Sequence, residues 1–336
     1  MEKMNAIMLI KTAREKLKGR DTFRMAAIHT GVTAAVSLVI LVLQMVLSKG
    51  IGNTGGLSGM GIRSLLETGQ MVLQGANTLL MPFWNLGFLY VALLWAREKA
   101  AEPADLLAGF RRIGPYLGLM LNRALLIFIV MIVCVNVCSM AFMLTPAASG
   151  IMELAGSYSS TEELYDYLYS LDTAQLMELF RSMLPMAVLW ELLGAVLLVL
   201  LLYRFRMAEF VILDEPRARG LSAMLLSAAM LRRRCWQLFK LDLRFWWYYG
   251  LKLLCMVLLY ADLLLEAVGV ALPISGDAAY LLTYGLYLIG FFAVEVSFRP
   301  RVETAYACAF EKLKELGAVQ KIIPTPKPQD MPWDAE

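Results

Sequence analysis

The sequence predicts an all-α, polytopic membrane protein with six transmembrane helices. The chain of 336 residues is 59% hydrophobic and has a mean hydropathy of +0.62, beyond the range of ordinary soluble domains. Six apolar runs each reach the ~20 helical residues that cross a ~30 Å hydrocarbon core. The lysines and arginines are distributed unevenly among the segments that connect these runs, which indicates a fixed orientation in the bilayer.

The predicted membrane helices lie near residues 26–47, 72–95, 117–143, 183–203, 246–268 and 279–298. Residues 1–25 form a basic segment before them, and no small-residue cleavage site follows the first run, so we expect an uncleaved first helix. With both termini in the cytoplasm, the outer loops hold only Lys49, Arg63 and Arg181 of the 31 basic residues. Because cytoplasmic loops carry the excess of Lys and Arg, we expect both termini inside.

The connecting segments suggest a plan of three helical hairpins. A basic, partly amphipathic lead-in segment precedes each outward-going helix, at 12–28, 106–121 and 225–243. Residues 145–182 form the large outer loop, and residues 204–245 form an amphipathic cytoplasmic connection. Residues 299–336 form a cytoplasmic tail, which we expect to be disordered from about 322 because its sequence is rich in proline.

The cytoplasmic connection is the predicted lipid contact. It carries Arg232, Arg233 and Arg234, and it returns to the membrane through Trp246 and Trp247, the residue types that gather at headgroup level. Each basic residue near an anionic leaflet contributes ~1 kcal/mol of attraction. We therefore expect anionic inner-leaflet lipid as a partner, with a membrane protein as a further possible partner. A simpler interpretation is that the arginines only anchor the topology.

Two polar sites are predicted within the membrane helices. Glu191 lies roughly 12 Å below the outer boundary by helical rise, and Asn85 is the best polar partner at similar depth. This pair could couple protons or cations, or it could form one structural hydrogen bond between helices. Glu295 lies near the inner interface with Arg299 four residues on, a spacing that predicts an ion pair on one helix face.

Several site types are disfavoured by the sequence. His29 is the single histidine, so a zinc site would need several well-placed cysteines or carboxylates. Cys134 and Cys138 lie one turn apart on an apolar face, which indicates packing. The glycine pattern at 50, 52 and 55 matches a dinucleotide fingerprint by spacing, but it follows a membrane helix and no strand. We expect no cofactor, no metal, no nucleic-acid partner and no enzymatic activity.

Four stretches carry a resemblance to a known family. They are AREKLKG (13–19), DLLAGF (105–110), SAAMLRRRCWQLFKLDLRFWW (227–247) and RPRVETAYACAFEKL (299–313). Together they resemble bacterial integral membrane proteins grouped as domain of unknown function 975. Members of that family often have glycine and lysine where this chain has Arg232, Arg233 and Arg234. The resemblance implies a bacterial cytoplasmic-membrane protein and adds no catalytic residue.

Three functions remain open from the sequence. The first is a non-enzymatic accessory or scaffold protein that works through lipid or protein contacts, because the chain lacks large soluble domains and nucleotide motifs. The alternative is a small-solute or lipid transporter with a polar site around Glu191 and Asn85. The third is an intramembrane enzyme.

Overall fold

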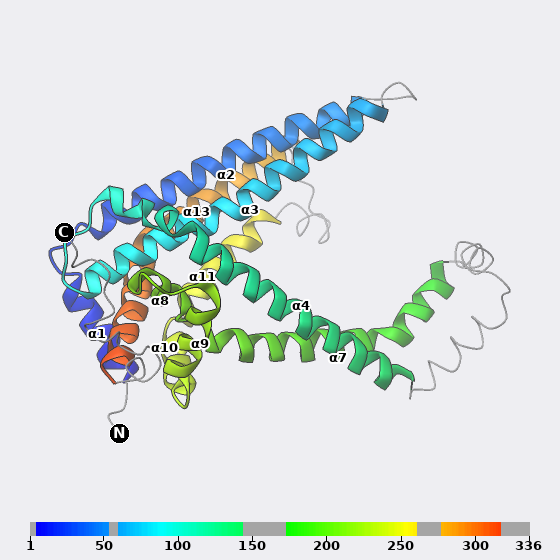
Figure 1. The fold of residues 1–336 in the computed structure, drawn as a ribbon. Helices are drawn as coiled ribbons and strands as arrows, with labels where there is room; N and C mark the ends of the chain where they lie inside the picture. Colours follow the sequence, from blue (N-terminus) through cyan, green and yellow to red (C-terminus); the bar gives the residue numbers. More distant parts are fainter. Residues whose placement is uncertain (1–4, 54–59, 144–172, 261–276, 317–336) are drawn as a thin grey trace, which may run out of the picture. The chain divides into compact units, whose positions relative to one another are not determined.

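The structure is a computed structural model that describes residues 5–53, 60–143, 173–260 and 277–316. Within these ranges the secondary structure is entirely helical (Figure 1). The chain divides into two compact units. Unit 1 comprises Met1–Leu117 and Met207–Glu336, and unit 2 comprises Gly118–Arg206.

Five helices of the described residues are long and apolar enough to cross a membrane. They are Thr22–Gly50, Arg63–Ala96, Pro103–Met140, Val188–Asp214 and Tyr280–Glu315. The prediction of an all-α protein with several membrane-length helices is therefore confirmed at this level. The predicted run at 246–268 is described only in its first part, where α11 (Trp246–Leu259) is a shorter apolar helix. Most of the predicted outer loop, up to residue 172, lies outside the described residues.

Three long helices form the frame of unit 1. The helices α2 (Thr22–Asn53), α3 (Met60–Ala96) and α13 (Asp277–Glu315) all pack against one another, and α11 packs against α13 (Figure 1). All three long helices contribute to one apolar core. Its fully buried members are Met25, Ala26, Phe88, Val91, Trp95, Leu106 and Val296.

Short helices precede the helices that were predicted to run outward. In chain order, α1 (Ala6–Lys16) precedes α2, the 3-10 helix η2 (Pro103–Arg112) precedes α4 (Ile113–Met143), and α10 (Cys235–Arg244) precedes α11. Two further short helices, α8 (Ala208–Asp214) and α9 (Gly220–Leu231), lead to α10. The start of η2 has a local cause, since Pro103 stands at its first turn and Asp105 Oδ2 accepts from the Glu102 amide at 2.8 Å.

Two cations of the N-terminal segment bind carbonyls at the last residue of α3 and in the turn that follows it. Lys16 Nζ donates to the carbonyl of Ala96, and Arg20 donates to the carbonyls of Glu98 (2.6 Å) and Lys99 (2.9 Å). The last carbonyls of a helix have no intrahelical partner and carry partial negative charge, so cations stabilise them. This fixes the junction of α1 and α2 beside the end of α3.

The last helix is longer than the sequence suggested. The predicted cytoplasmic tail began at residue 299, whereas α13 continues through Pro300 to Glu315. The reason is an apolar stripe at helical spacing, with Val302, Tyr306, Phe310 and Leu313 all buried in unit 1. The tail that remains, from residue 317, lies outside the described residues.

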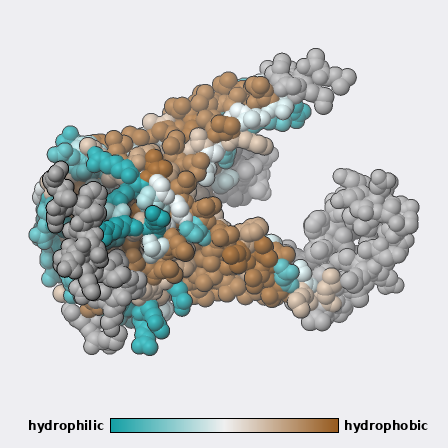
Figure 2. Space-filling view, in the orientation of Figure 1, coloured by the Kyte–Doolittle hydropathy of each residue, from teal (hydrophilic) through white to brown (hydrophobic). Residues whose placement is uncertain are grey.

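Unit 2 contains most of α4 and the whole of α7 (Thr173–Arg204). The described part of α7 begins ten residues before the predicted membrane run at 183–203. A Cβ at Gly194 would lie 4.0 Å from Cys134 Sγ on α4, so the helices meet there. Arg123 Nη2 donates to the carbonyl of Phe205 at 2.9 Å. The surfaces of these helices, like those of the long helices of unit 1, are predominantly hydrophobic (Figure 2).

Candidate functional site

The candidate site is a polar cluster in unit 1 around the buried carboxylate of Glu295. The side chain of Glu295 is 1% exposed, and Arg299, one turn further along α13, places Nη1 3.0 Å from its Oε2. The structure thus brings together the two residues whose spacing predicted an ion pair. The sequence alone did not indicate how many other helices reach the same carboxylate.

Helix α11 supplies two more partners for Glu295. Lys252 Nζ lies 2.8 Å from Oε1, and the hydroxyl of Tyr248 donates to the same oxygen at 2.7 Å. Tyr248 and Lys252 are four residues apart, so they lie on one face of α11. The ammonium of Lys252 also lies over the rings of Tyr248 (5.3 Å) and Phe291 (5.2 Å), where the aromatic faces favour a cation.

Arg299 extends the cluster to α3 and α2. Its Nη2 donates to Asn85 Oδ1 at 3.0 Å, and its guanidinium lies 4.7 Å from the centre of the Phe88 ring. Its Nη1 also lies 3.3 Å from His29 Nδ1. Glu303, one turn after Arg299, places Oε1 4.0 Å from Nε of the guanidinium. The Glu295–Arg299 cluster (Glu295, Arg299, Lys252, Tyr248, Asn85 and His29) therefore joins α2, α3, α11 and α13.

The environment of His29 assigns its tautomer. An arginine is always a donor, so the 3.3 Å contact makes Nδ1 the acceptor and places the proton on Nε2 of a neutral ring. The ring is fully buried, stacks on Trp84 at 5.2 Å and 8°, and Trp84 Nε1 donates to the His29 carbonyl at 3.1 Å. Among the described residues, Nε2 has no hydrogen-bond partner. His29 thus packs as a flat aromatic group beside the charges.

The charges of the cluster balance once the neighbouring carboxylate of Glu303 is included. Two cations, Arg299 and Lys252, face the carboxylates of Glu295 and Glu303. Removal of one partner of a buried ion pair costs about 3–5 kcal/mol, because it leaves the other charge without compensation. The arrangement can therefore hold four helices together at one level. Among the described residues, no group of three or more His, Cys, Asp or Glu side chains is placed to hold a metal ion.

Glu191, the other half of the predicted polar site, lies in unit 2. It is exposed on α7, and no described residue forms a hydrogen bond or an ion pair with it. Asn85 belongs to unit 1, where its side-chain oxygen accepts from Arg299. The pairing of Glu191 with Asn85 stays a prediction.

The predicted lipid contacts lie at the two ends of α10. Arg232 and Arg233 are exposed in the turn between α9 and α10, and Arg234 is half-buried. Trp246 is 68% exposed at the start of α11. Trp247 is half-buried and packs edge-on against Phe298 at 4.6 Å.

A second ionic network joins the ends of three helices in unit 1. Arg97 lies after α3, and its guanidinium contacts Asp214 of α8 and Glu311 of α13, the latter with Nε 2.7 Å from Oε1. Burial lowers the pKa of Arg97, but its hydrogen bonds and charge interactions with Asp214 and Glu311 outweigh this effect and raise the pKa above its ordinary value. Lys314 Nζ reaches the other oxygen of Asp214 at 2.6 Å.

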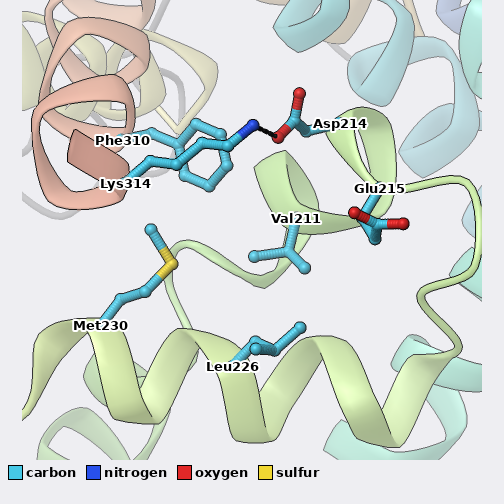
Figure 3. Close-up of a pocket in the computed structure, with 7 residues that line it drawn as sticks. All are labelled: Val211, Asp214, Glu215, Leu226, Met230, Phe310 and Lys314. Carbon is cyan, nitrogen blue, oxygen red and sulfur yellow. Dashed lines mark hydrogen bonds and ion pairs between the residues drawn. The ribbon is translucent and has the colours of Figure 1, made fainter. Parts of the chain in front are cut away.

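A small cavity adjoins this network. Its lining combines Asp214, Glu215 and Lys314 with four apolar side chains, Val211, Leu226, Met230 and Phe310 (Figure 3). The cavity volume is about 20 Å³, which is room for a single water molecule. It is too small for a solute or a lipid chain.

Sequence reasoning missed Lys252, Tyr248 and the role of His29. Lys252 did carry a signal, because a lysine six residues into an apolar run is costly and needs a partner. Comparison with known protein families, curated sequences and solved structures found no match. The resemblance to domain of unknown function 975 therefore stays a prediction.

Proposed function

We propose that this chain is a non-enzymatic, multi-pass protein of the bacterial cytoplasmic membrane, which acts as an accessory or scaffold protein through contacts with lipid or another membrane protein. In this proposal it has six spans and both termini inside, with residues 246–268 as the fifth span. The support for the topology is the distribution of basic residues, of which Lys49, Arg63 and Arg181 alone fall in the outer loops.

The observation that carries the proposal is that the charged groups of the Glu295–Arg299 cluster are bound by partners within the protein. The carboxylate of Glu295 accepts from three side chains of two helices, and Arg299 donates to partners on three helices. A transport site must release such partners when a substrate arrives, and here the release of Arg299 or Lys252 would leave the buried carboxylate of Glu295 without part of its compensating charge. The cluster is therefore better suited to fix the helices than to bind and release a solute.

Reconstitution tests this proposal. Purified protein in proteoliposomes should give no proton or cation flux above that of protein-free vesicles, while protein purified in mild detergent should retain lipid or a partner protein in stoichiometric amount. Glu295→Gln should lower stability and leave the flux at the vesicle background. A protein-dependent flux would contradict the accessory role.

One observation favours a transporter as the second candidate. Glu191 is an exposed carboxylate within the apolar helix α7, and no described residue pairs with it. A carboxylate at such a position is costly unless it meets water, an ion or a polar group. If the chain is a transporter, a proteoliposome flux should be present in the wild type and lost in Glu191→Gln.

A further inference from the structure

The helix α10 presents two different faces. Leu238 and Leu241 are buried in unit 1 and hold the helix in place. On the remaining surface, Trp236, Phe239 and Leu243 are 64%, 43% and 59% exposed. Exposure of three large apolar side chains on a ten-residue helix is unfavourable in water, and it is typical of a helix that lies in a membrane interface.

The exposed rings are arranged together with a cation. Trp236 and Phe239 stack at 5.2 Å with an interplanar angle of 20°, and Lys240 Nζ lies 5.9 Å from the centre of the Trp236 ring. The two stacked rings thus form a flat apolar surface with a positive charge at its edge. This combination suits the boundary between acyl chains and phosphates.

The turn before α10 holds two exposed arginines on a fixed backbone conformation. Arg233 has a φ of 67°, the left-handed conformation that reverses the chain between α9 and α10. Backbone hydrogen bonds close the turn, with the Arg234 amide donating to the Leu231 carbonyl at 2.8 Å. Leu231 before the turn and Leu238 after it are both fully buried. The exposed side chains of Arg232 and Arg233 therefore project from a fixed backbone.

Basic residues greatly outnumber acidic residues in this region. Between residues 217 and 244 the sequence has seven basic residues and a single acidic one, Asp242. The carboxylate of Asp242 accepts a hydrogen bond from Tyr306 of α13, so it is engaged within unit 1. An anionic surface is the electrostatic complement of this region.

We propose that the α10 face, formed by Arg232, Arg233, Trp236, Phe239, Lys240 and Leu243, binds anionic phospholipid of the inner leaflet. The arginines contact headgroup phosphates, and the aromatic and aliphatic side chains insert at the level of the upper acyl chains. This inference rests on the proposed function and names its partner class. Chain connectivity favours lipid over an acidic protein, because α10 leads at Trp246 directly into the apolar helix α11.

Lipid titration of the purified full chain tests this inference. Native mass spectrometry in detergent would follow binding of phosphatidylglycerol and, in parallel, of phosphatidylcholine. We expect the wild type to prefer phosphatidylglycerol. We expect R232Q/R233Q to weaken phosphatidylglycerol binding by about 30-fold, from ~1 kcal/mol for each basic residue, with little change for phosphatidylcholine.

Two controls make the test specific. K18Q/K99Q removes the same charge from two exposed lysines outside the α10 face and should bind phosphatidylglycerol like the wild type. R232K/R233K keeps the charge and should retain most of the preference. Amide hydrogen exchange in nanodiscs should locate the phosphatidylglycerol-dependent protection at residues 232–243.

Two outcomes would overturn the inference: equal binding of both lipids by the wild type, or unchanged binding by R232Q/R233Q. In either case a retained protein partner would leave the accessory role intact. A proteoliposome flux would contradict the accessory role without any effect on the lipid titration.

Discussion

Gly87 of α3 and Gly109 of η2 lie where the two backbones touch. A Cβ at Gly87 would lie 1.7 Å from the carbonyl oxygen of Leu106, and a Cβ at Gly109 would lie 1.9 Å from the carbonyl oxygen of Phe83. Each glycine thus makes room for the backbone of the other element. This contact seats Leu106 in the apolar core beside Phe88.

Substitution of either glycine by alanine should force η2 away from α3. Because the clashing atoms belong to the backbone, a side-chain rotation cannot relieve the overlap, and we expect Gly87→Ala and Gly109→Ala each to destabilise by about 1–3 kcal/mol or more. Thermal unfolding in detergent would measure this. Gly75→Ala on the same helix, where nothing lies within 4 Å of the new Cβ, is the matched control and should be neutral or slightly stabilising. Equal behaviour of all three variants would contradict the close approach.

The sequence could not show this contact. Nothing in the sequence around Gly87 or Gly109 distinguishes them from other glycines, because their function depends on a backbone that is distant along the chain. Local spacing was informative where the interaction is local, as for Glu295 and Arg299 on one helix. The partners from α2, α3 and α11 depend on how helices rotate and pack against one another. The periodicity of one helix does not determine that arrangement.

The Glu295–Arg299 cluster predicts strong energetic coupling between Glu295 and Lys252. Glu295→Gln removes the charge that compensates Lys252 and Arg299, and we expect it to destabilise by about 3 kcal/mol. Lys252→Met alone should cost less, because Arg299 and Tyr248 still satisfy the carboxylate. In the double variant the losses should be clearly less than additive, which a double-mutant cycle on unfolding measures.

The control for this cycle is a pair of residues that do not contact each other, Glu295 and Lys18. Lys18→Gln removes an exposed lysine of the N-terminal segment, so its effect should add to that of Glu295→Gln within about 0.5 kcal/mol. Additivity of Glu295→Gln and Lys252→Met would show that the 2.8 Å ion pair contributes nothing to stability.

Cysteine labelling tests the six-span topology. In a variant without the five native cysteines, Asp166→Cys in the outer loop should react with a membrane-impermeant maleimide added to intact cells. Arg217→Cys, at an exposed position between α8 and α9, should react only after the cells are opened. The physical basis is the excess of basic residues around position 217, which resist translocation. Labelling of position 217 in intact cells would exclude the arrangement with both termini inside.

The extension of α13 shows a further limit of sequence reasoning. Arg299 and Pro300 mark the end of an apolar run, and they predicted the end of the membrane span and the start of a tail. The helix continues because Val302, Tyr306 and Phe310 are buried in unit 1. The mean hydropathy of a stretch of residues identified the part of the helix that is apolar enough to lie in a bilayer. It did not identify the amphipathic part that packs on protein.

Glu191 distinguishes the accessory role from transport. Glutamine keeps the shape of the side chain and most of its hydrogen-bonding capacity, so in an accessory protein Glu191→Gln should leave thermal unfolding and lipid retention unchanged. If Glu191 forms the predicted hydrogen bond with Asn85, Glu191→Leu should cost on the order of 1 kcal/mol, the usual contribution of one hydrogen bond between membrane helices. The matched control is Asn136→Leu on α4, whose amide donates to Ile132 within its own helix at 2.8 Å. Removal of the Asn136 amide should cost less than the loss of such an interhelical hydrogen bond, because no second helix takes part. If Glu191→Gln instead abolished a flux that the folded wild type supports, the carboxylate would be a proton or cation site and the transporter would replace the accessory protein.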